Sequence, residues 1–332
     1  MRRIGLAVVV ALNLMLPLAA EAQPMGKPAR MGSLWFGPVQ SPEEQARFAP
    51  TNLFWQAMKD LGWVYGQNIV VDRRYGESPD QLRAAAADLV RLKVDVLFVS
   101  SAGFAKLLQL ETRTIPIVVV GAGSDLVAAG LVASLARPGG NLTGVQVRAV
   151  DLISKKLEFL RTLVPNVSQI AFLTEDVSAS LTPLYDQEMA ETARKLGLKV
   201  HTVTVHGPGE FAAAFLSITK NRDQGILVLS SPFSNLHRKQ IVELAAKHRI
   251  VAIYENEMSV EDGGLISYGA NREEMVRRGA VLVDKILKGA KPGDLPVEQP
   301  TKFKLVINLK TANALGLTIP PSLLGRADRL IQ

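Results

Sequence analysis

The sequence contains no cysteine and only four histidines among its 332 residues. The lack of cysteine excludes disulfide bonds, thiolate nucleophiles, iron–sulfur clusters and cysteine-ligated zinc. Four histidines leave little material for a histidine-rich centre, so we expect neither a bound metal ion nor a cofactor. The net charge is +7, but no run of five lysines or arginines occurs. A nucleic-acid-binding tail is therefore not indicated, and we expect no nucleic-acid partner.

Residues 1–22 have the pattern of a secretory signal peptide. Arg2 and Arg3 form a basic start, an apolar stretch follows over 4–18, and Ala20-Glu21-Ala22 provides small residues for cleavage. The apolar stretch is shorter than the roughly 20 residues of a membrane-spanning helix, and no second stretch of that length follows. We therefore expect a cleavable leader and a periplasmic protein in a bacterium with two membranes.

Length and composition indicate two folded domains. A domain typically holds about 150 residues, and 48% of this chain is hydrophobic, enough for two buried cores. Predicted strands alternate with predicted helices, one of which begins at the serine cap and proline of Ser78-Pro79. Strands such as Val94–Val99 lack polar alternation, which is typical of parallel strands covered on both faces. The pattern predicts an α/β fold with two lobes, near 29–146 and 147–267, joined by short hinge strands.

The loops that follow the predicted strands are the candidate binding region. Ligands of open parallel sheets bind beyond the carboxyl ends of the strands. These loops carry hydroxyl groups, small residues that leave amides exposed at helix N-termini, and aromatic walls. The candidate ligand-binding residues are Trp35, Phe36, Ser100, Ser101, Gly123, Ser124, Asp125, Thr174, Glu175, Ser230, Ser231, Tyr254 and Glu255. The alternative is that they are ordinary loop and capping residues.

Catalytic and nucleotide motifs are incomplete. Gly121-Ala122-Gly123-Ser124 resembles the start of a dinucleotide fingerprint, but Leu126 stands where the third glycine belongs and the segment follows the fourth strand. The nucleophile elbow Gly-x-Ser-x-Gly is absent, because Ala122 and Leu126 occupy its glycine positions around Ser124. Glu175-Asp176 and Glu255/Glu257 could form an acid/base pair across the cleft, but the sequence cannot show their separation. The simpler interpretation is that they are solvated loop carboxylates.

Several longer stretches are typical of one transport family. They are 61–69, 89–96, 130–144, 263–269, 283–292, 296–303 and 307–312. Through them the chain resembles the ABC transporter substrate-binding proteins of the tryptophan/aromatic amino-acid-like group, which are type I periplasmic binding proteins. The resemblance extends over essentially the whole chain after the leader.

The resemblance implies two Rossmann-like lobes with parallel sheets, three hinge crossings and a ligand held in the cleft between the lobes. The implied N-terminal lobe comprises 29–146 plus 268–299, and the C-terminal lobe comprises 147–267 plus 300–332. Two departures from the family pattern are visible. The usual Asp-Pro-Val is Asp125-Leu126-Val127 here, and Thr174-Glu175-Asp176 replaces an Asn-Pro loop.

The implied function is that of a periplasmic solute-binding component of an ABC importer, not of an enzyme. We expect it to capture a small polar or amino-acid-like ligand by hinge closure and, as a monomer, to deliver it to an ABC permease in the inner membrane. A ligand ammonium group would pair with Asp125 or Glu175. The alternatives are a secreted α/β hydrolase and a ligand-sensing domain for a membrane receptor.

Overall fold

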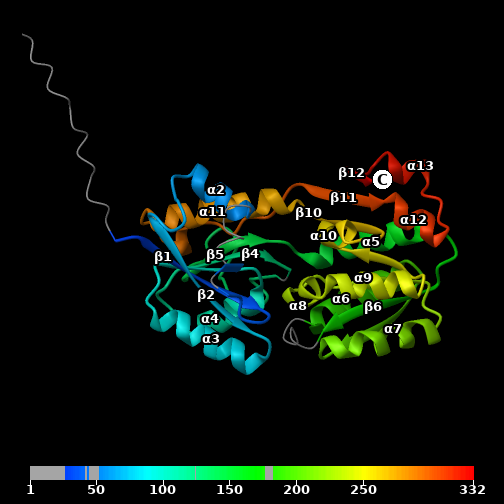
Figure 1. The fold of residues 1–332 in the computed structure, drawn as a ribbon, viewed down its shortest axis with the longest axis horizontal. Coiled ribbons are helices and arrows are strands. Elements are labelled where there is room, and N and C mark those ends of the chain that lie inside the picture. Colours follow the sequence, from blue (N-terminus) through cyan, green and yellow to red (C-terminus); the bar gives the residue numbers. More distant parts are fainter. Residues whose placement is uncertain (1–26, 42, 45–51, 124, 176–181) are drawn as a thin grey trace, which may run out of the picture.

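The computed structural model describes residues 27–41, 43–44, 52–123, 125–175 and 182–332. The expected signal peptide and Ser124 lie outside the described residues. Two β-sheets form two halves that lie side by side along the long axis of the molecule (Figure 1). The first sheet has the strand order β2-β1-β3-β4-β5, and the second has the order β12-β11-β10-β9-β8-β6-β7.

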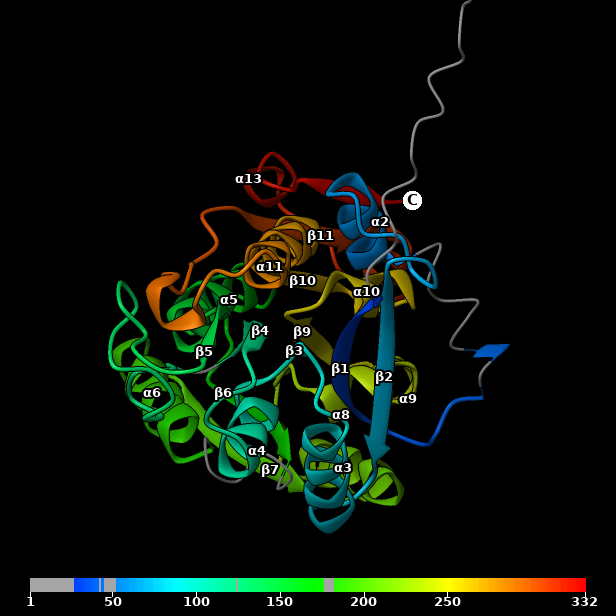
Figure 2. The ribbon, with the colours of Figure 1, turned by 90° about the vertical axis from the view of Figure 1, so that its left-hand side faces the viewer.

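The first sheet is entirely parallel and is covered on both faces. Its strands are β1 (Ala29–Phe36), β2 (Ile69–Gly76), β3 (Val96–Val99), β4 (Ile117–Ala122) and β5 (Leu142–Gln146). Its helices are α2 (Leu53–Asp60), α3 (Pro79–Arg91), α4 (Ala102–Glu111) and α11 (Arg272–Leu287). Figure 2 shows α2 and α11 on one face and α3 and α4 on the other. Apolar side chains on both faces of these short strands explain this double cover.

The second sheet is mostly parallel. Its strands are β6 (Gln169–Glu175), β7 (Lys199–Val205), β8 (Gly225–Val228), β9 (Val251–Tyr254), β10 (Ile266–Ala270), β11 (Phe303–Asn308) and β12 (Arg329–Ile331). Its helices are α5 (Ala149–Leu163), α6 (Thr182–Lys195), α7 (Phe211–Lys220), α8 (Pro232–Leu236), α9 (Arg238–Lys247), α10 (Glu257–Glu261), α12 (Leu309–Leu315) and α13 (Pro321–Leu324). The sequence-based expectation of parallel strands fails at one place, since β10 and β11 pair antiparallel.

The antiparallel pair follows from the route of the chain. After β10 the chain enters α11, which packs against the first sheet, and then returns to the second sheet as β11. The chain re-enters the second sheet beside the residue at which it left, since the amide of Asn271 donates to the carbonyl of Lys302 at 3.0 Å. Strand β11 therefore runs back along β10 in the opposite direction. The predicted lobe boundary at 267/268 falls inside β10, and the described chain passes between the sheets a few residues later.

The segments that connect the two halves lie beside one another. The amide of Gln146 donates to the carbonyl of Glu298 at 2.8 Å, and the amide of Glu298 donates to the carbonyl of Gly144 at 2.9 Å. The connection after β5 and the connection before β11 are thus hydrogen-bonded neighbours. Among the described residues, no helix is long and apolar enough to span a membrane.

Candidate ligand-binding site

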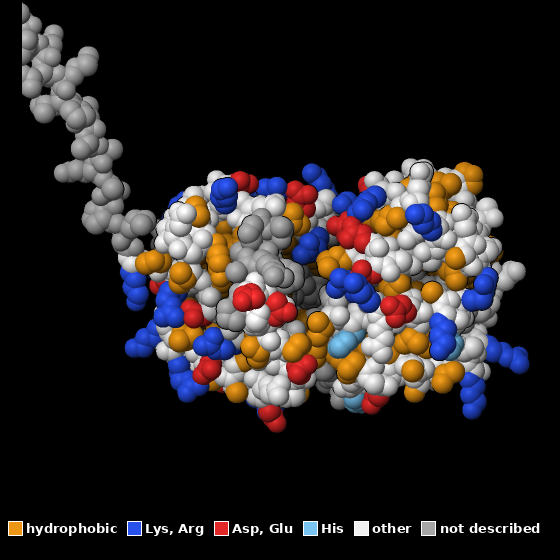
Figure 3. All heavy atoms as spheres, viewed as in Figure 1, with side chains coloured by type: hydrophobic (Ala, Val, Ile, Leu, Met, Phe, Trp, Pro, Cys, Tyr) orange, Lys and Arg blue, Asp and Glu red, His pale blue; other side chains and the backbone are white. Residues whose placement is uncertain are grey.

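A cavity of about 560 Å³ lies between the two halves, within the size range of small-molecule sites. The first sheet and α2 and α11 supply most of its apolar lining, and both halves contribute polar residues. Figure 3 shows a hollow between the halves with lysine and arginine side chains along its border. The cavity is therefore placed to enclose a molecule that both halves contact.

One face of β1 and β2 forms the apolar wall. The two strands pair in register, with Trp35 beside Tyr75 and Ser33 beside Arg73. Because side chains alternate along a strand, these residues share one face of the sheet, and all four line the cavity. Phe98 of β3 is paired with Ser33, whose hydroxyl donates to the Phe98 carbonyl at 2.9 Å. This face of the sheet therefore presents aromatic rings and one guanidinium group to the cavity.

Helix α2 closes the inner end of this wall. Asn52 caps the helix by accepting a hydrogen bond from the amide of Phe54 at 2.9 Å. Phe54 contacts Trp55 and Phe98 with ring centroids 5.2 and 4.4 Å apart. Phe54 and Trp55 are buried but still line the cavity. The cap and the ring contacts fix the floor of the site.

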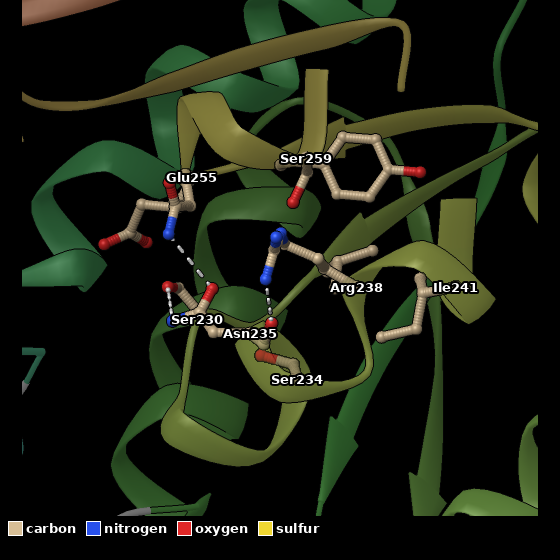
Figure 4. Close-up of a pocket in the computed structure, with 10 residues that line it drawn as sticks. Ser230, Ser234, Asn235, Arg238, Ile241, Glu255 and Ser259 are labelled. Atoms are coloured by element: carbon tan, nitrogen blue, oxygen red, sulfur yellow. Dashed lines mark hydrogen bonds between the residues drawn. The ribbon is translucent and has the colours of Figure 1, made fainter. Parts of the chain in front are cut away.

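The opposite wall is a polar network formed by α8 and by the loops after β8 and β9. Asn256 donates to the side-chain oxygen of Asn235 at 3.2 Å, and Asn235 donates to the hydroxyl of Ser230 at 3.4 Å. Figure 4 shows Ser230, Asn235, Glu255 and Arg238 around a small pocket behind this wall. That pocket has a volume of about 10 Å³, roughly enough for one water molecule. The ligand-sized space is therefore the larger cavity.

Charged side chains line the cavity unevenly. Glu255 and Glu257 each face a lysine of the protein, Lys156 at 2.8 Å and Lys304 at 3.0 Å. Lys156 and Glu255 are both largely buried. Arg73 and Arg272 also line the cavity and add two positive charges. Burial raises the pKa of the Tyr75 phenol, while the nearby cation of Arg73 acts in the opposite direction.

Five of the residues predicted from sequence line this cavity: Trp35, Phe36, Ser100, Ser230 and Glu255. Trp35 is 37% exposed, which leaves its ring available to a ligand. Phe36 also touches Phe233 across the halves, with ring centroids 5.6 Å apart. The structure thus brings together the aromatic end of β1 and the ends of β3, β8 and β9.

Other predicted residues lie elsewhere. Ser101 and Ser231 cap α4 and α8 by accepting hydrogen bonds from Phe104 and Ser234 amides. Asp125 accepts hydrogen bonds from the amides of Val127 and Ala128, and its carboxylate lies 3.7 Å from Arg148. The cavity lining does not include Ser101, Gly123, Asp125, Thr174, Glu175, Ser231 or Tyr254. A direct contact of these residues with a ligand stays a prediction.

Three of those residues are buried in the second half. Thr174 and Glu175 end β6 with 3% of their surface exposed. Tyr254 is 2% exposed, and its hydroxyl has no hydrogen-bond partner among the described residues. Burial raises the pKa of the Tyr254 phenol well above its usual range. Tyr75 of the other half lines the cavity, whereas a ligand contact of Tyr254 stays a prediction.

Several charged or aromatic residues of the lining were not predicted from the sequence, among them Arg73, Tyr75, Arg272 and Lys304. Arg73 and Tyr75 stand at alternate positions of β2, so the two-residue period of that strand was an available signal. Arg272 opens α11, and Lys304 belongs to the returning strand β11. Arg272 closely follows β10, a strand whose loop was not among those considered, and Lys304 lies inside a strand, where the loops do not reach.

Comparison with known proteins identifies the family. Residues 40–331, most of the chain, match the family described as ABC transporter substrate binding protein. A tyrosine-binding protein of Clostridioides difficile (strain R20291) is 28% identical over 272 residues, covering 80% of this chain and 75% of the relative. Two crystal structures at 26% identity each cover 92% of this chain and 100% of their own. They are a conserved domain protein of Vibrio cholerae, with a TM-score of 0.80, and an ABC domain in complex with L-Trp from Streptococcus pneumoniae, with a TM-score of 0.77.

These matches confirm the predicted family resemblance and the α/β fold of type I periplasmic binding proteins. The family consists of solute-binding proteins that work with ABC transporters, and it is not a family of enzymes. On the match over residues 40–331 and the shared fold, this chain belongs to the family of ABC transporter substrate-binding proteins.

Proposed function

We propose that this protein is the solute-binding component of an ABC importer and that it captures a small amino-acid-like ligand with an aromatic body. The observation that carries the proposal is the cavity between the two halves, with an aromatic wall on one side and polar loops on the other. Such a site can bury a ring and orient a polar head at once. The relatives that bind tyrosine and L-Trp support the same ligand class.

The proposed contacts divide the ligand between the halves. Trp35 and Tyr75 would contact its ring, and Ser230 and Asn235 would face its polar head. Ser100 of the first half lines the same cavity. Aromatic contacts of this kind contribute about 0.5–1.5 kcal/mol each beyond the area that they bury.

The proposed lobes are the two halves of the chain, with the hinge at the three adjacent crossings. Backbone hydrogen bonds at Gln146, Glu298 and Asn271 tie these crossings together, which supports a common axis of motion. A ligand that contacts both walls would favour the closed arrangement. The residues around 1–22 support export to the periplasm, where an inner-membrane permease would receive the ligand from a monomeric carrier.

The proposal is tested by thermal unfolding of the chain from Gln23 onwards, stripped of co-purified ligand. Aromatic amino acids, aromatic acids and non-aromatic metabolites are compared. A ligand at 100 times its Kd adds about 2.7 kcal/mol, which raises the midpoint by about 2–4 °C in a protein of this size. We expect a shift with aromatic compounds and no turnover of them. Stabilisation by non-aromatic metabolites alone would contradict the proposed ligand class.

A further inference from the structure

We infer that the ligand presents a carboxylate without an accompanying ammonium group, as in an aromatic hydroxy acid. The inference rests on the proposed function, since it specifies the polar head of the ligand in the same cavity. It comes from the charges that line the site. An amino acid carries both an anionic and a cationic group, and a cleft that selects it must neutralise both.

The carboxylates of the cleft are already neutralised by the protein. Lys156 contacts Glu255 at 2.8 Å, and Lys304 contacts Glu257 at 3.0 Å. Lys156 is 7% exposed and Glu255 is 14% exposed, so water screens this pair weakly. A ligand ammonium beside Glu255 would therefore meet the repulsion of a buried lysine. A ligand ammonium beside Glu257 would likewise be repelled by Lys304, although less strongly, because this pair is more exposed.

Two carboxylates near the cleft have partners of their own. Asp125 is held by Arg148 and by two backbone amides, and Glu273 lies 3.1 Å from Arg277. Neither carboxylate lines the cavity, and Glu175 does not line it either. Within the described part of the chain, no carboxylate that lines the cavity lacks a lysine partner. An ammonium group has no charged partner to replace the water that it would lose.

The positive charges of the lining suit a carboxylate. Arg73 shares its sheet face with Trp35 and Tyr75, so a ring on that wall brings its acid group within the range of a guanidinium. Arg272 lines the cavity at the start of α11 and forms no ion pair with any described residue. Of the three cations of the lining, Arg73, Arg272 and Lys304, Lys304 is paired with Glu257. Arginine binds carboxylates through paired hydrogen bonds, which gives both affinity and orientation.

The test is a calorimetric titration with matched pairs of compounds that differ only in one group. Each pair joins an amino acid to the hydroxy acid with the same ring: phenylalanine with 3-phenyllactate, tyrosine with 3-(4-hydroxyphenyl)lactate, and tryptophan with indole-3-lactate. We expect the hydroxy acid of at least one pair to have a Kd about tenfold lower than that of its amino acid. Raising the ionic strength should weaken its binding.

Two variants test the charges directly. Arg272→Gln should raise the Kd of the hydroxy acid about tenfold, since it removes a charged hydrogen-bond donor from the cavity. The matched control is Arg277→Gln, which removes the same charge from the same helix outside the cavity and should leave the Kd unchanged. Lys304→Gln frees Glu257 and should shift the preference towards the amino acid of the pair.

The outcomes separate this inference from the function on which it rests. Tighter binding of the amino acid in every pair would overturn the inference and leave an aromatic solute-binding protein. An unchanged hydroxy-acid Kd in Arg272→Gln would also overturn it. If no compound of any pair bound, while a non-aromatic metabolite stabilised the protein, the proposed ligand class itself would fail.

Discussion

At the scale of single residues, the kind of residue in the site was easier to predict than its position. Trp35 and Phe36 stand at the end of a buried strand, where a ligand wall is expected, and both line the cavity. Asp125 and Tyr254 also follow strands, but local hydrogen bonds and burial direct them elsewhere. Tyr75 was missed because its placement depends on the pairing of β1 with β2, which joins segments about 40 residues apart.

A pair of substitutions separates these two groups. Tyr75→Ala removes a ring from the wall and should raise the Kd of an aromatic ligand about tenfold, since truncating a central aromatic contact costs about 1–2 kcal/mol. Asp125→Asn should change the Kd less than about twofold, because its carboxylate serves its own loop. Calorimetric titration of both variants measures this difference. A larger increase in Kd for Asp125→Asn than for Tyr75→Ala would instead indicate that the Asp125 loop binds the polar head of the ligand.

Tyr254 predicts a pH dependence of stability. Its raised pKa means that the folded protein keeps the phenol neutral while the unfolded chain ionises near pH 10, so stability falls as the pH rises above about 10. Tyr254→Phe should remove this contribution and flatten the loss between pH 9 and 11. At pH 7 the variant should stay within about 1 kcal/mol of the wild type, because the hydroxyl has no described hydrogen-bond partner.

Denaturant unfolding of both proteins across this pH range measures the effect. Tyr75, which is closer to the surface, titrates in both proteins and does not disturb the comparison. If the free energy of unfolding changed with pH in the same way in both proteins, the prediction would be wrong. The phenol of Tyr254 would then ionise equally easily in the folded and the unfolded protein.

At the scale of elements, long periodic segments were predicted well and short ones poorly. The apolar residues of 272–287 keep a helical period throughout, and this segment is α11 in the structure. The segment 236–248 likewise contains α9, and α8 directly before it is a separate five-residue helix. The helices α10 and α13 and the strand β12 were not predicted, since segments of three to five residues carry too little periodicity.

The contact of α11 with the first sheet makes a prediction about two glycines. A Cβ atom on Gly279 would lie 2.3 Å from Val120, whose branched side chain has little freedom to move. Gly279→Ala should therefore destabilise the protein by about 1–3 kcal/mol. Gly103 in α4 is the matched control: its Cβ would meet nothing closer than 3.8 Å, so Gly103→Ala should stabilise by up to about 1 kcal/mol.

Chemical unfolding of the two alanine variants tests this contrast. The two substitutions should change the free energy of unfolding in opposite directions, because both gain helix propensity and only Gly279 meets a packed side chain. Stabilisation by Gly279→Ala would show that α11 can move away from the sheet at little cost.

At the scale of the whole molecule, the alternation of strands and helices was sufficient to predict two α/β halves. It could not predict the antiparallel return of β11, because that depends on where α11 delivers the chain. The cavity also depends on this return, since Arg272 and Lys304 come from the two segments that pass between the halves. A site formed by such crossings is determined by tertiary structure and not by local sequence.

The adjacent crossings predict a motion of the halves relative to each other. A ligand that stabilises the protein should make it more compact, because it draws the two walls together. Small-angle X-ray scattering with and without saturating ligand measures this as a decrease in the radius of gyration. Binding without any such decrease would mean that the cleft holds its ligand as a fixed cavity.

The central claim is that the ligand binds in the cavity between the halves, and tryptophan fluorescence tests it most directly. Of the three tryptophans, Trp35 and Trp55 line the cavity, whereas Trp63 donates to Asp284 at 2.8 Å and does not line it. The titrant is a phenyl compound that stabilises the protein, and the wild type is compared with Trp35→Phe and Trp63→Phe. The account predicts a saturable change in emission that persists in Trp63→Phe and is clearly smaller in Trp35→Phe. A change that remains undiminished in Trp35→Phe, or that disappears in Trp63→Phe, would contradict binding in this cavity.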